Sequence, residues 1–445
     1  MSASGRVAAA LHGRHVSVVV VGAGQAGLAA SWHLRQQGVE HVVLERQTAA
    51  HEWSDSRWDN FTLVTPNWQC RLPGHPYPGD DPDGFMTRDQ VVAYLADYVA
   101  RVDAPLYEHT TVTSLRQGRD GGFVVSVSSS KGQRAVLSAD HVIVATGGYH
   151  DPRIPRLAER LPADIVQLHS SRYRSAAALP EGAVLVVGTG QSGAQIAEDL
   201  HLEGRQVHLV VGSAPRCARF YRGRDCVAWL EEMGTYDVAV ENQPGGLAAR
   251  EKTNHYLTGR DGGRDIDLRA FALEGMRLHG RLTGGEGGRL QLAPTLEASL
   301  DAADAVADSI KDAIDAHIDR HRIAAPTEAR YTPVWRPEVE STELDLTVEG
   351  VTSVVWAVGF TSNFRWLGVP VFDGEGQPCH QRGVTAVDGL YFLGLPWLHT
   401  WGSGRFASVQ RDAAHVVDHL VQRRADPRAP SAEREPVLAA GASLP

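Results

Sequence analysis

The sequence of 445 residues predicts an α/β protein built from two similar parallel-sheet units. Two stretches carry this prediction: residues 16–27 read VSVVVVGAGQAG, and residues 183–193 read AVLVVGTGQSG. In both, an apolar run typical of a parallel strand buried on both faces leads into a Gly-x-Gly-x-x-Gly turn. The third observation is that each turn continues into a helical pattern, over 26–37 and 194–202, followed by a glycine suited to end a helix.

The first turn has the sequence context of a dinucleotide site. The next apolar strand, HVVLE, ends in Glu45. Glycines let a pyrophosphate approach the backbone, the helix N-terminus faces its charge, and the acid accepts hydrogen bonds from ribose hydroxyls. We therefore expect an FAD site made by Gly22, Gly24, Gln25, Ala26, Gly27 and Glu45.

The second turn differs at the position of the acid. The strand QVHLVVG leads to Ser213, and Arg216 follows. A 2′-phosphate favours arginine and is repelled by a carboxylate, so this pattern predicts NADPH. The expected NADPH-binding residues are Gly188, Gly190, Gln191, Ser192, Gly193, Ser213 and Arg216. Arg219, Arg222 and Arg224 are alternative phosphate ligands, or part of a solvated loop.

Further elements fit around these units in chain order. A loop rich in Pro and Gly precedes the helical pattern RDQVVAYLADYVARV, and the short strands TTVTSL, GGFVVSVSS, RAVLS and HVIVATGGY follow it. The stretch EASLDAADAVADSIKDAIDAHIDRHRI repeats apolar residues at helical spacing. VTSVVWAVGF predicts a late strand, and GLYFLG with the helix-like GSGRFASVQRDAAHVVDHL predicts a return to the first unit.

These assignments predict two Rossmann-like dinucleotide-binding domains, with an NADPH domain inserted into an FAD domain and a partly helical insertion on the substrate side. The expected boundaries, in chain order, are a flexible tail at 1–15, the FAD domain at 16–152 and 336–425, the NADPH domain at 153–335 including the insertion 225–330, and a disordered tail at 426–445.

Composition and charge exclude several classes of protein. A formal charge of −10 gives no general attraction to nucleic acid. No apolar stretch reaches membrane-spanning length, and the first fifteen residues lack the apolar core of a signal peptide. We therefore expect a cytoplasmic enzyme that acts on a small molecule, with neither nucleic acid nor membrane as a partner.

The four cysteines limit the reactions that the protein could catalyse. Cys70, Cys217, Cys226 and Cys379 form no C-x-x-C pair and have no metal-ligand spacing, so we expect no metal site. Disulfide reductases also carry two nucleotide turns, but they need a redox-active dithiol close to the flavin. The sequence therefore predicts that electrons go elsewhere, or to the thiols of a partner.

Several motifs resemble the single-component flavin-containing monooxygenases, the class B flavoprotein monooxygenases, in the order of that family: GAGQAGLA with Glu45, VIVATGGY, GTGQSGAQIAEDL, AVGFTSN and GLYFLGLPWLHTWGSG. The bacterial and plant-type branch that includes indole-3-pyruvate monooxygenases is the most similar. Of the family fingerprint F-x-G-x-x-x-H-x-x-x-Y, the chain keeps His169 and Tyr173 but has Ala163 and Ile165 at the first two positions.

The resemblance implies that NADPH reduces FAD, that O₂ forms a peroxyflavin, and that one oxygen atom enters a small molecule by N- or S-oxygenation or a related reaction. It favours a homodimer and assigns Asn67 a catalytic position. Further implied cofactor-binding residues are Arg46, Trp53, Arg57, Trp58, Val112, Thr146, Gly147, Gly359, Trp401, Gly402 and Ser403. Core packing is the alternative for the aromatic residues. Two other functions stay open: electron transfer from NADPH through flavin to a small acceptor, and redox sensing without catalysis.

Overall fold

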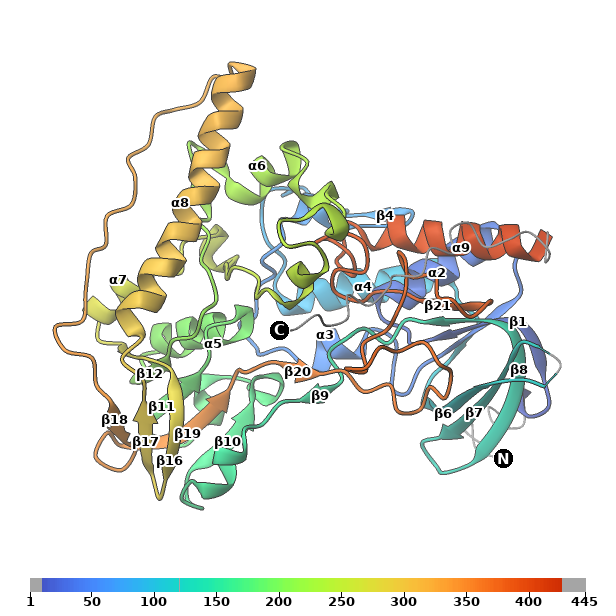
Figure 1. Cartoon of the computed structure of the whole chain (residues 1–445), viewed down its shortest axis with the longest axis horizontal. Helices are drawn as coiled ribbons and strands as arrows, with labels where there is room; N and C mark the ends of the chain where they lie inside the picture. Colours follow the sequence, from blue (N-terminus) through green and yellow to red (C-terminus); the bar gives the residue numbers. More distant parts are fainter. Residues whose placement is uncertain (1–9, 120, 426–445) are drawn as a thin grey trace, which may run out of the picture.

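The computed structural model describes residues 10–119 and 121–425, which form two units that each contain a largely parallel sheet (Figure 1). The first sheet has the strand order β5-β2-β1-β8-β7-β6, and β21 pairs with β8. Its strands are β1 His15–Val21, β2 His41–Leu44, β5 Leu106–Tyr107, β6 Thr110–Gln117, β7 Phe123–Ser129, β8 Arg134–Val144 and β21 Leu390–Phe392. Strands β5, β2, β1, β8 and β21 run parallel, whereas β6 and β7 pair antiparallel.

Helices cover this sheet. They are α2 Gln25–Gln36, α3 His51–Asp55, α4 Arg88–Val102 and α9 Val409–Ala425. Helix α2 packs against α4 and α9, and its side chains Leu28 and Leu34 are fully buried. Helix α4 has the predicted bounds because Thr87 and Gln90 form a capping box, which satisfies two of its free amide groups.

The second sheet has the order β10-β19-β11-β12-β15, and all of its strands run parallel. Its elements are β10 Val166–His169, β11 Ala183–Val187, helix α5 Gln191–Leu202, β12 Val207–Val210, β15 Arg277–His279 and β19 Val351–Trp356. Every residue of β11 and β12 is buried, as the apolar run of β11 predicts, and His208 is the polar residue within β12.

Two excursions leave the second sheet. The first, between β12 and β15, contains β13 Phe220–Tyr221, β14 Arg224–Asp225, α6 Cys226–Glu232 and α7 Leu268–Leu273. The second, between β15 and β19, contains β16 Leu282–Glu286, β17 Arg289–Leu292, α8 Leu296–His321 and β18 Glu343–Asp345. Helix α8, predicted from its apolar spacing, buries Ile314 and Ile318 in a cluster with Trp229 and Leu230 of α6. In the described part of the chain, no helix is both long and apolar enough to cross a bilayer.

Short strands connect the two units. Strand β9 (Asp151–Pro152) pairs antiparallel with β20 (Phe360–Thr361) where the chain passes from one unit to the other and back (Figure 1). Strands β3 (Arg71–Leu72) and β4 (His75–Pro76) form a small hairpin in the first unit. The two passages at β9 and β20 are what make one domain an insertion in the other.

Several predicted boundaries need correction. Strand β19 belongs to the second sheet, so that unit extends past residue 335 to the end of β19. The region 225–330 is no separate insertion, because it supplies β15 to the same sheet. At the N-terminus, Leu11 is fully buried and Arg14 pairs with Glu40, so ordered chain begins inside the predicted tail. RAVLS and HVIV form one strand, β8. Residues 1–9 and the predicted tail 426–445 lie outside the described residues.

Candidate functional site

In the first glycine turn, the first and third glycines have no room for a side chain, whereas the second glycine borders open space. Gly22 has a φ of +104°, and a Cβ there would lie 2.7 Å from the carbonyl oxygen of Ala145. A Cβ on Gly27 would overlap the carbonyl oxygen of Gly22. At Gly24, by contrast, a Cβ would meet no heavy atom within 4 Å. Helix α2 starts at the next residue, Gln25, so the open space lies at a helix N-terminus, where a pyrophosphate binds.

The second glycine turn repeats this geometry. Gly188 has a φ of +105°, and its Cβ would lie 2.7 Å from the carbonyl oxygen of Ala357. A Cβ on Gly193 would overlap the carbonyl oxygen of Gly188, and one on Gly190 would meet nothing within 4 Å. Helix α5 follows, with Ser192 exposed in its first turn. Both turns therefore fit a dinucleotide pyrophosphate.

Glu45 is held beside the first turn. One of its carboxylate oxygens accepts a hydrogen bond of 2.8 Å from the N–H of Ala23, and the other accepts one of 2.9 Å from Gln47. The N–H of Thr110 donates to the carbonyl of Glu45 at 2.7 Å, which brings the start of β6 and its residue Val112 to this corner. Each carboxylate oxygen can accept a second bond, so the group can also bind ribose hydroxyls. The neighbouring Arg46 is exposed and pairs with Glu52.

The structure corrects the assignment of Arg216. Its side chain is buried, its Nε donates to Asp304 of α8 at 2.5 Å, and its guanidinium lies 4.1 Å from the ring centroid of Tyr331. A guanidinium whose charge is already paired with a carboxylate is poorly suited to bind a phosphate. Ser213, in contrast, is exposed after the end of β12.

The three alternative arginines are also paired with acids. Arg219 pairs with Asp225, Arg222 with Asp315 of α8, and Arg224 with Glu232 of α6. The arginine cluster therefore stabilises the first excursion. The sequence gives little warning of this, since two of the acids, Asp304 and Asp315, lie far along the chain.

A bridge of side chains links the first turn to the segment before α9. The indole Nε1 of Trp53 donates to the Gln25 side chain at 3.2 Å, and the Gln25 amide donates to the carbonyl of Gly404 at 3.0 Å. The Trp53 ring stacks on Phe406 with 5.1 Å between centroids. Arg57 lies 4.9 Å above the Trp53 ring. The predicted lining residues Trp53 and Arg57 are thus next to the FAD turn.

Trp58 is buried near these residues, since its neighbour Phe61 also packs against Trp53 and Arg57. It is 4% exposed, packs edge-on against Phe61 with 5.0 Å between centroids, and belongs to the main hydrophobic core. Its surroundings agree with core packing, the alternative given for the aromatic residues.

Asn67 is held by hydrogen bonds at both ends of its amide: the amide donates to the carbonyl of Asp81 at 2.9 Å and accepts from the N–H of Met86 at 2.9 Å. Both ends of this buried amide hold the loop before α4, so the structure gives Asn67 a structural role, and its catalytic role stays a prediction.

Trp401, a predicted site residue, contacts several aromatic and cationic side chains that the sequence did not predict. Its ring stacks on Tyr236 with 4.4 Å between centroids and lies nearly parallel to His255 at 6.1 Å. Its Nε1 donates to Asn254 at 2.7 Å, and the Arg405 guanidinium lies 3.6 Å from its ring centroid. The first excursion of the NADPH unit therefore contacts the segment before α9 of the FAD unit.

Two neighbours of Trp401 shape this segment. Ser403 is buried, donates to Asp412 of α9 at 2.6 Å and accepts from the N–H groups of His399 and Thr400 at 3.0 Å. A Cβ on Gly402 would crowd the side chain of Ser408. The Ser403 hydroxyl thus orders the turn that leads into α9.

His169 and Gly359 connect the carboxyl ends of β10 and β19. The Nδ1 of His169 accepts from the N–H of Ser171, so Nε2 carries the hydrogen and donates to the carbonyl of Gly359 at 3.0 Å. Burial lowers the pKa of His169, which keeps this ring neutral. Near the end of β8, His150 contacts the carbonyl and hydroxyl of Thr146 at 3.2 Å, and Gly147 has a φ of +72°.

Three comparisons place the fold among known proteins. Residues 19–231 match the family model described as pyridine nucleotide-disulphide oxidoreductase. The flavin-containing monooxygenase from Stenotrophomonas maltophilia has the same fold: the TM-score is 0.58 at 22% identity, over 92% of this chain and 99% of that one. The probable indole-3-pyruvate monooxygenase YUCCA3 of Arabidopsis thaliana is 32% identical over 204 residues, 44% of this chain and 46% of that protein.

A relative that aligns over almost its full length shows to which family the chain belongs. The CzcO-like oxidoreductase of Geobacillus kaustophilus is 31% identical over 411 residues, which are 91% of this chain and 98% of that protein. The chain belongs to the CzcO-like oxidoreductases. This confirms the resemblance found in the sequence and the α/β fold. The two open glycine turns fit the expected FAD and NADPH.

In this CzcO-like oxidoreductase, two cysteines that are apart in the sequence lie together. The Cys217 and Cys226 side chains are both buried in the cluster around α6, and the Cys217 thiol donates to the carbonyl of Ala218 at 3.2 Å. The neighbouring Cys217 and burial raise the pKa of Cys226, and burial raises the pKa of Cys70 to about 12. Because the thiolate is the reactive form, Cys226 and Cys70 are unreactive toward a disulfide substrate. The absence of a C-x-x-C motif did not exclude this contact, which depends on the fold.

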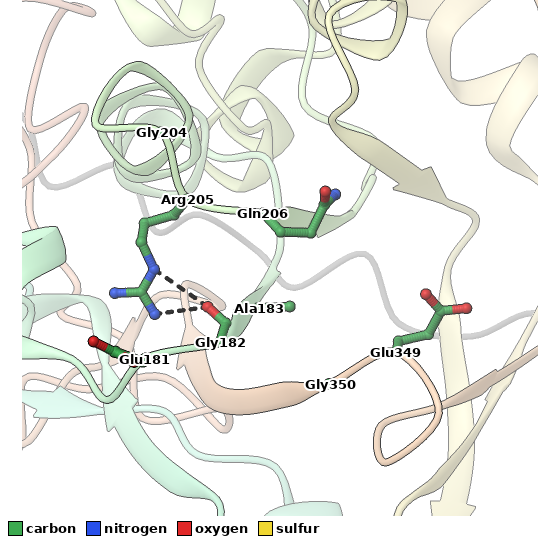
Figure 2. A pocket seen from close by; sticks show the side chains of 8 residues that line it. All are labelled: Glu181, Gly182, Ala183, Gly204, Arg205, Gln206, Glu349 and Gly350. Carbon is green, nitrogen blue, oxygen red and sulfur yellow. Dashed lines mark hydrogen bonds between the residues drawn. The ribbon is translucent and has the colours of Figure 1, made fainter.

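A depression at the amino ends of the strands of the second sheet is no further nucleotide site. It is lined by Glu181, Gly182, Ala183, Gly204, Arg205, Gln206, Glu349 and Gly350 (Figure 2). The Arg205 guanidinium donates to the carbonyl of Gly182 and to two further carbonyls, so it ties loops together. These residues precede strands β11, β12 and β19, whereas nucleotides bind at the carboxyl ends of parallel strands.

Proposed function

We propose that this protein is an NADPH-dependent FAD monooxygenase, which transfers one atom of O₂ to a small molecule at a nucleophilic nitrogen or sulfur atom. One observation carries the proposal: the chain forms the same open glycine cradle twice, and only the first has a carboxylate beside it. Glu45 suits an adenosine ribose with free hydroxyls, whereas the exposed Ser213 leaves room for a 2′-phosphate.

The residues of the two cradles have distinct tasks. FAD, when bound, supplies the redox and oxygen chemistry, which protein side chains cannot perform alone. Gly24 and the N-terminus of α2 bind its pyrophosphate, and Glu45 binds its ribose. Gly190 and the N-terminus of α5 bind the pyrophosphate of NADPH. The amide groups at each helix start orient the phosphates and stabilise their negative charge.

The aromatic side chains between the units exclude water. Trp53 and Phe406 stack beside the first cradle, and Trp401 stacks on Tyr236 where the units meet. A site without water protects reactive intermediates from hydrolysis and stray protons. His169, kept neutral by burial, holds the end of β19 in place through Gly359 and supplies no charge of its own.

The proposal is tested by the stoichiometry of turnover. The FAD-loaded protein is supplied with NADPH, O₂ and a panel of amines and sulfides, and NADPH consumption, product and hydrogen peroxide are measured together. We expect at least one substrate to give one product per NADPH. If every substrate class returns all NADPH electrons as hydrogen peroxide, electron transfer to a small acceptor becomes the leading alternative. NADH, measured in parallel, should support turnover less well than NADPH.

A further inference from the structure

Two arginines next to Trp53 and Trp401 have no acidic partner. Arg57 and Arg405 are half-buried, and among the described residues no carboxylate forms an ion pair with either of them. The other arginines discussed above, at 216, 219, 222 and 224, all pair with acids. A partly buried cation without a counter-charge destabilises a protein unless a ligand supplies the negative charge.

Arg57 and Arg405 lie in one region. Arg57 lies over Trp53, and the Gln25 bridge connects Trp53 to Gly404, the residue before Arg405. Both guanidinium groups lie near Tyr149, a residue that is 65% exposed, and its hydroxyl group raises the pKa of each. Burial lowers the pKa of both. Near Arg57, Glu52 partly opposes this effect although it pairs with Arg46, whereas no carboxylate opposes it at Arg405.

The surroundings of Arg405 face the second unit. Its guanidinium stacks on Trp401, and next to Trp401 lie Tyr236 and His255 of the first excursion. Burial and the nearby positive charge of Arg405 lower the pKa of His255 to about 4, so this ring adds no charge at neutral pH. The acids of the excursion near this point, Asp225 and Asp265, are bonded to Arg219. Neither acid forms an ion pair with Arg405.

We propose that Arg405, together with Arg57, binds the carboxylate group of the substrate. A planar guanidinium matches a carboxylate with two parallel hydrogen bonds, and the flanking indole rings of Trp53 and Trp401 suit an aromatic or apolar substrate body. The inference rests on the proposed function, since it assigns the substrate class to the same site. It predicts an organic acid that carries its oxidisable atom on a compact apolar body.

Two other anions compete for this assignment, and both are testable. The FAD pyrophosphate lies at the first cradle, beside Gln25, and the 2′-phosphate of NADPH lies beyond the end of β12. If Arg405 bound either one, its removal would weaken that cofactor. If it binds the substrate, removal leaves the affinity for both cofactors unchanged.

The experiment measures binding to the oxidised, FAD-loaded protein, without NADPH or turnover. Phenylacetate and its neutral isostere 2-phenylacetamide are titrated while the flavin absorbance is followed, and NADP⁺ is titrated separately. For phenylacetate, we expect Arg405→Gln to weaken binding about tenfold or more, and Arg405→Lys to retain part of the affinity. The amide should change less than twofold. Arg411→Gln is the matched control, since Arg411 lies in α9 and pairs with Asp237.

Each outcome decides a point. Equal binding of acid and amide by the unmodified protein overturns the inference, as does loss of FAD or weaker NADP⁺ binding in Arg405→Gln. Arg57→Gln should weaken phenylacetate in the same direction, and no change would limit the site to Arg405. Because the readout needs no oxygen chemistry, its failure is separate from failure of the proposed monooxygenase activity.

Discussion

Replacement of Gly24 by valine should separate cofactor binding from folding. The backbone at Gly24 has φ −75° and ψ −176°, an extended conformation that valine adopts readily, and a Cβ there meets no protein atom within 4 Å. Gly24→Val should therefore fold. Its side chain would, however, occupy the space in front of the α2 N-terminus that the pyrophosphate needs.

The magnitude follows from linkage. At FAD concentrations a hundredfold above the dissociation constant, the unmodified protein gains about 2.7 kcal/mol of stability from the ligand, whereas Gly24→Val should gain none. The assay is thermal unfolding of apoprotein with and without added FAD. Gly190→Val is the matched control, because the second cradle has the same geometry: it should keep the FAD response and lose the response to NADP⁺. A Gly24→Val protein that stays yellow and is still stabilised by FAD would refute the reasoning.

Three further predictions follow from the polar interior. Arg216→Ala should lower the free energy of unfolding by about 1.5–3 kcal/mol, because it removes one of the two guanidinium groups bound to Asp304, the other being that of Arg269, and it should not change NADPH affinity relative to NADH; urea unfolding and titrations of both cofactors check this. Asn67→Ala should cost about 1–3 kcal/mol in the same unfolding assay without slowing flavin reduction. Burial lowers the pKa values of the stacked pair His208 and His279 to about 4. As the pH falls, these histidines therefore bind protons in the unfolded chain at a higher pH than in the folded protein. Stability should drop between about pH 6.5 and pH 4, by roughly 3 kcal/mol for each histidine, and replacing both with leucine should flatten this part of the pH profile.

The elements predictable from the sequence are those whose signal is local. An apolar run, three glycines and a capping pattern lie within one short stretch, so both cradles and α4 could be placed before the structure was known. Glu45 was predictable for the same reason, as it ends the strand next to the first turn.

The rest depends on contacts between distant segments. Arg216 looks like a phosphate ligand until α8 brings Asp304 against it, and Asn67 looks free until its loop folds around the amide. The domain boundary at residue 335 was wrong because β19 inserts between β10 and β11, a pairing that no local pattern shows. Arg405 gave no signal at all, since its lack of an acidic partner is a property of the folded chain.

The central claim, that one atom of O₂ enters a small molecule, is tested most directly with isotope-labelled oxygen. The FAD-loaded protein is turned over with NADPH under ¹⁸O₂, with amines, sulfides and carboxylate-bearing variants of each as substrates, and products are examined by mass spectrometry. The account predicts one ¹⁸O atom per product molecule, matched by one NADPH consumed. Product that takes its oxygen from water, or hydrogen peroxide as the sole fate of ¹⁸O₂ with every substrate class, would contradict it.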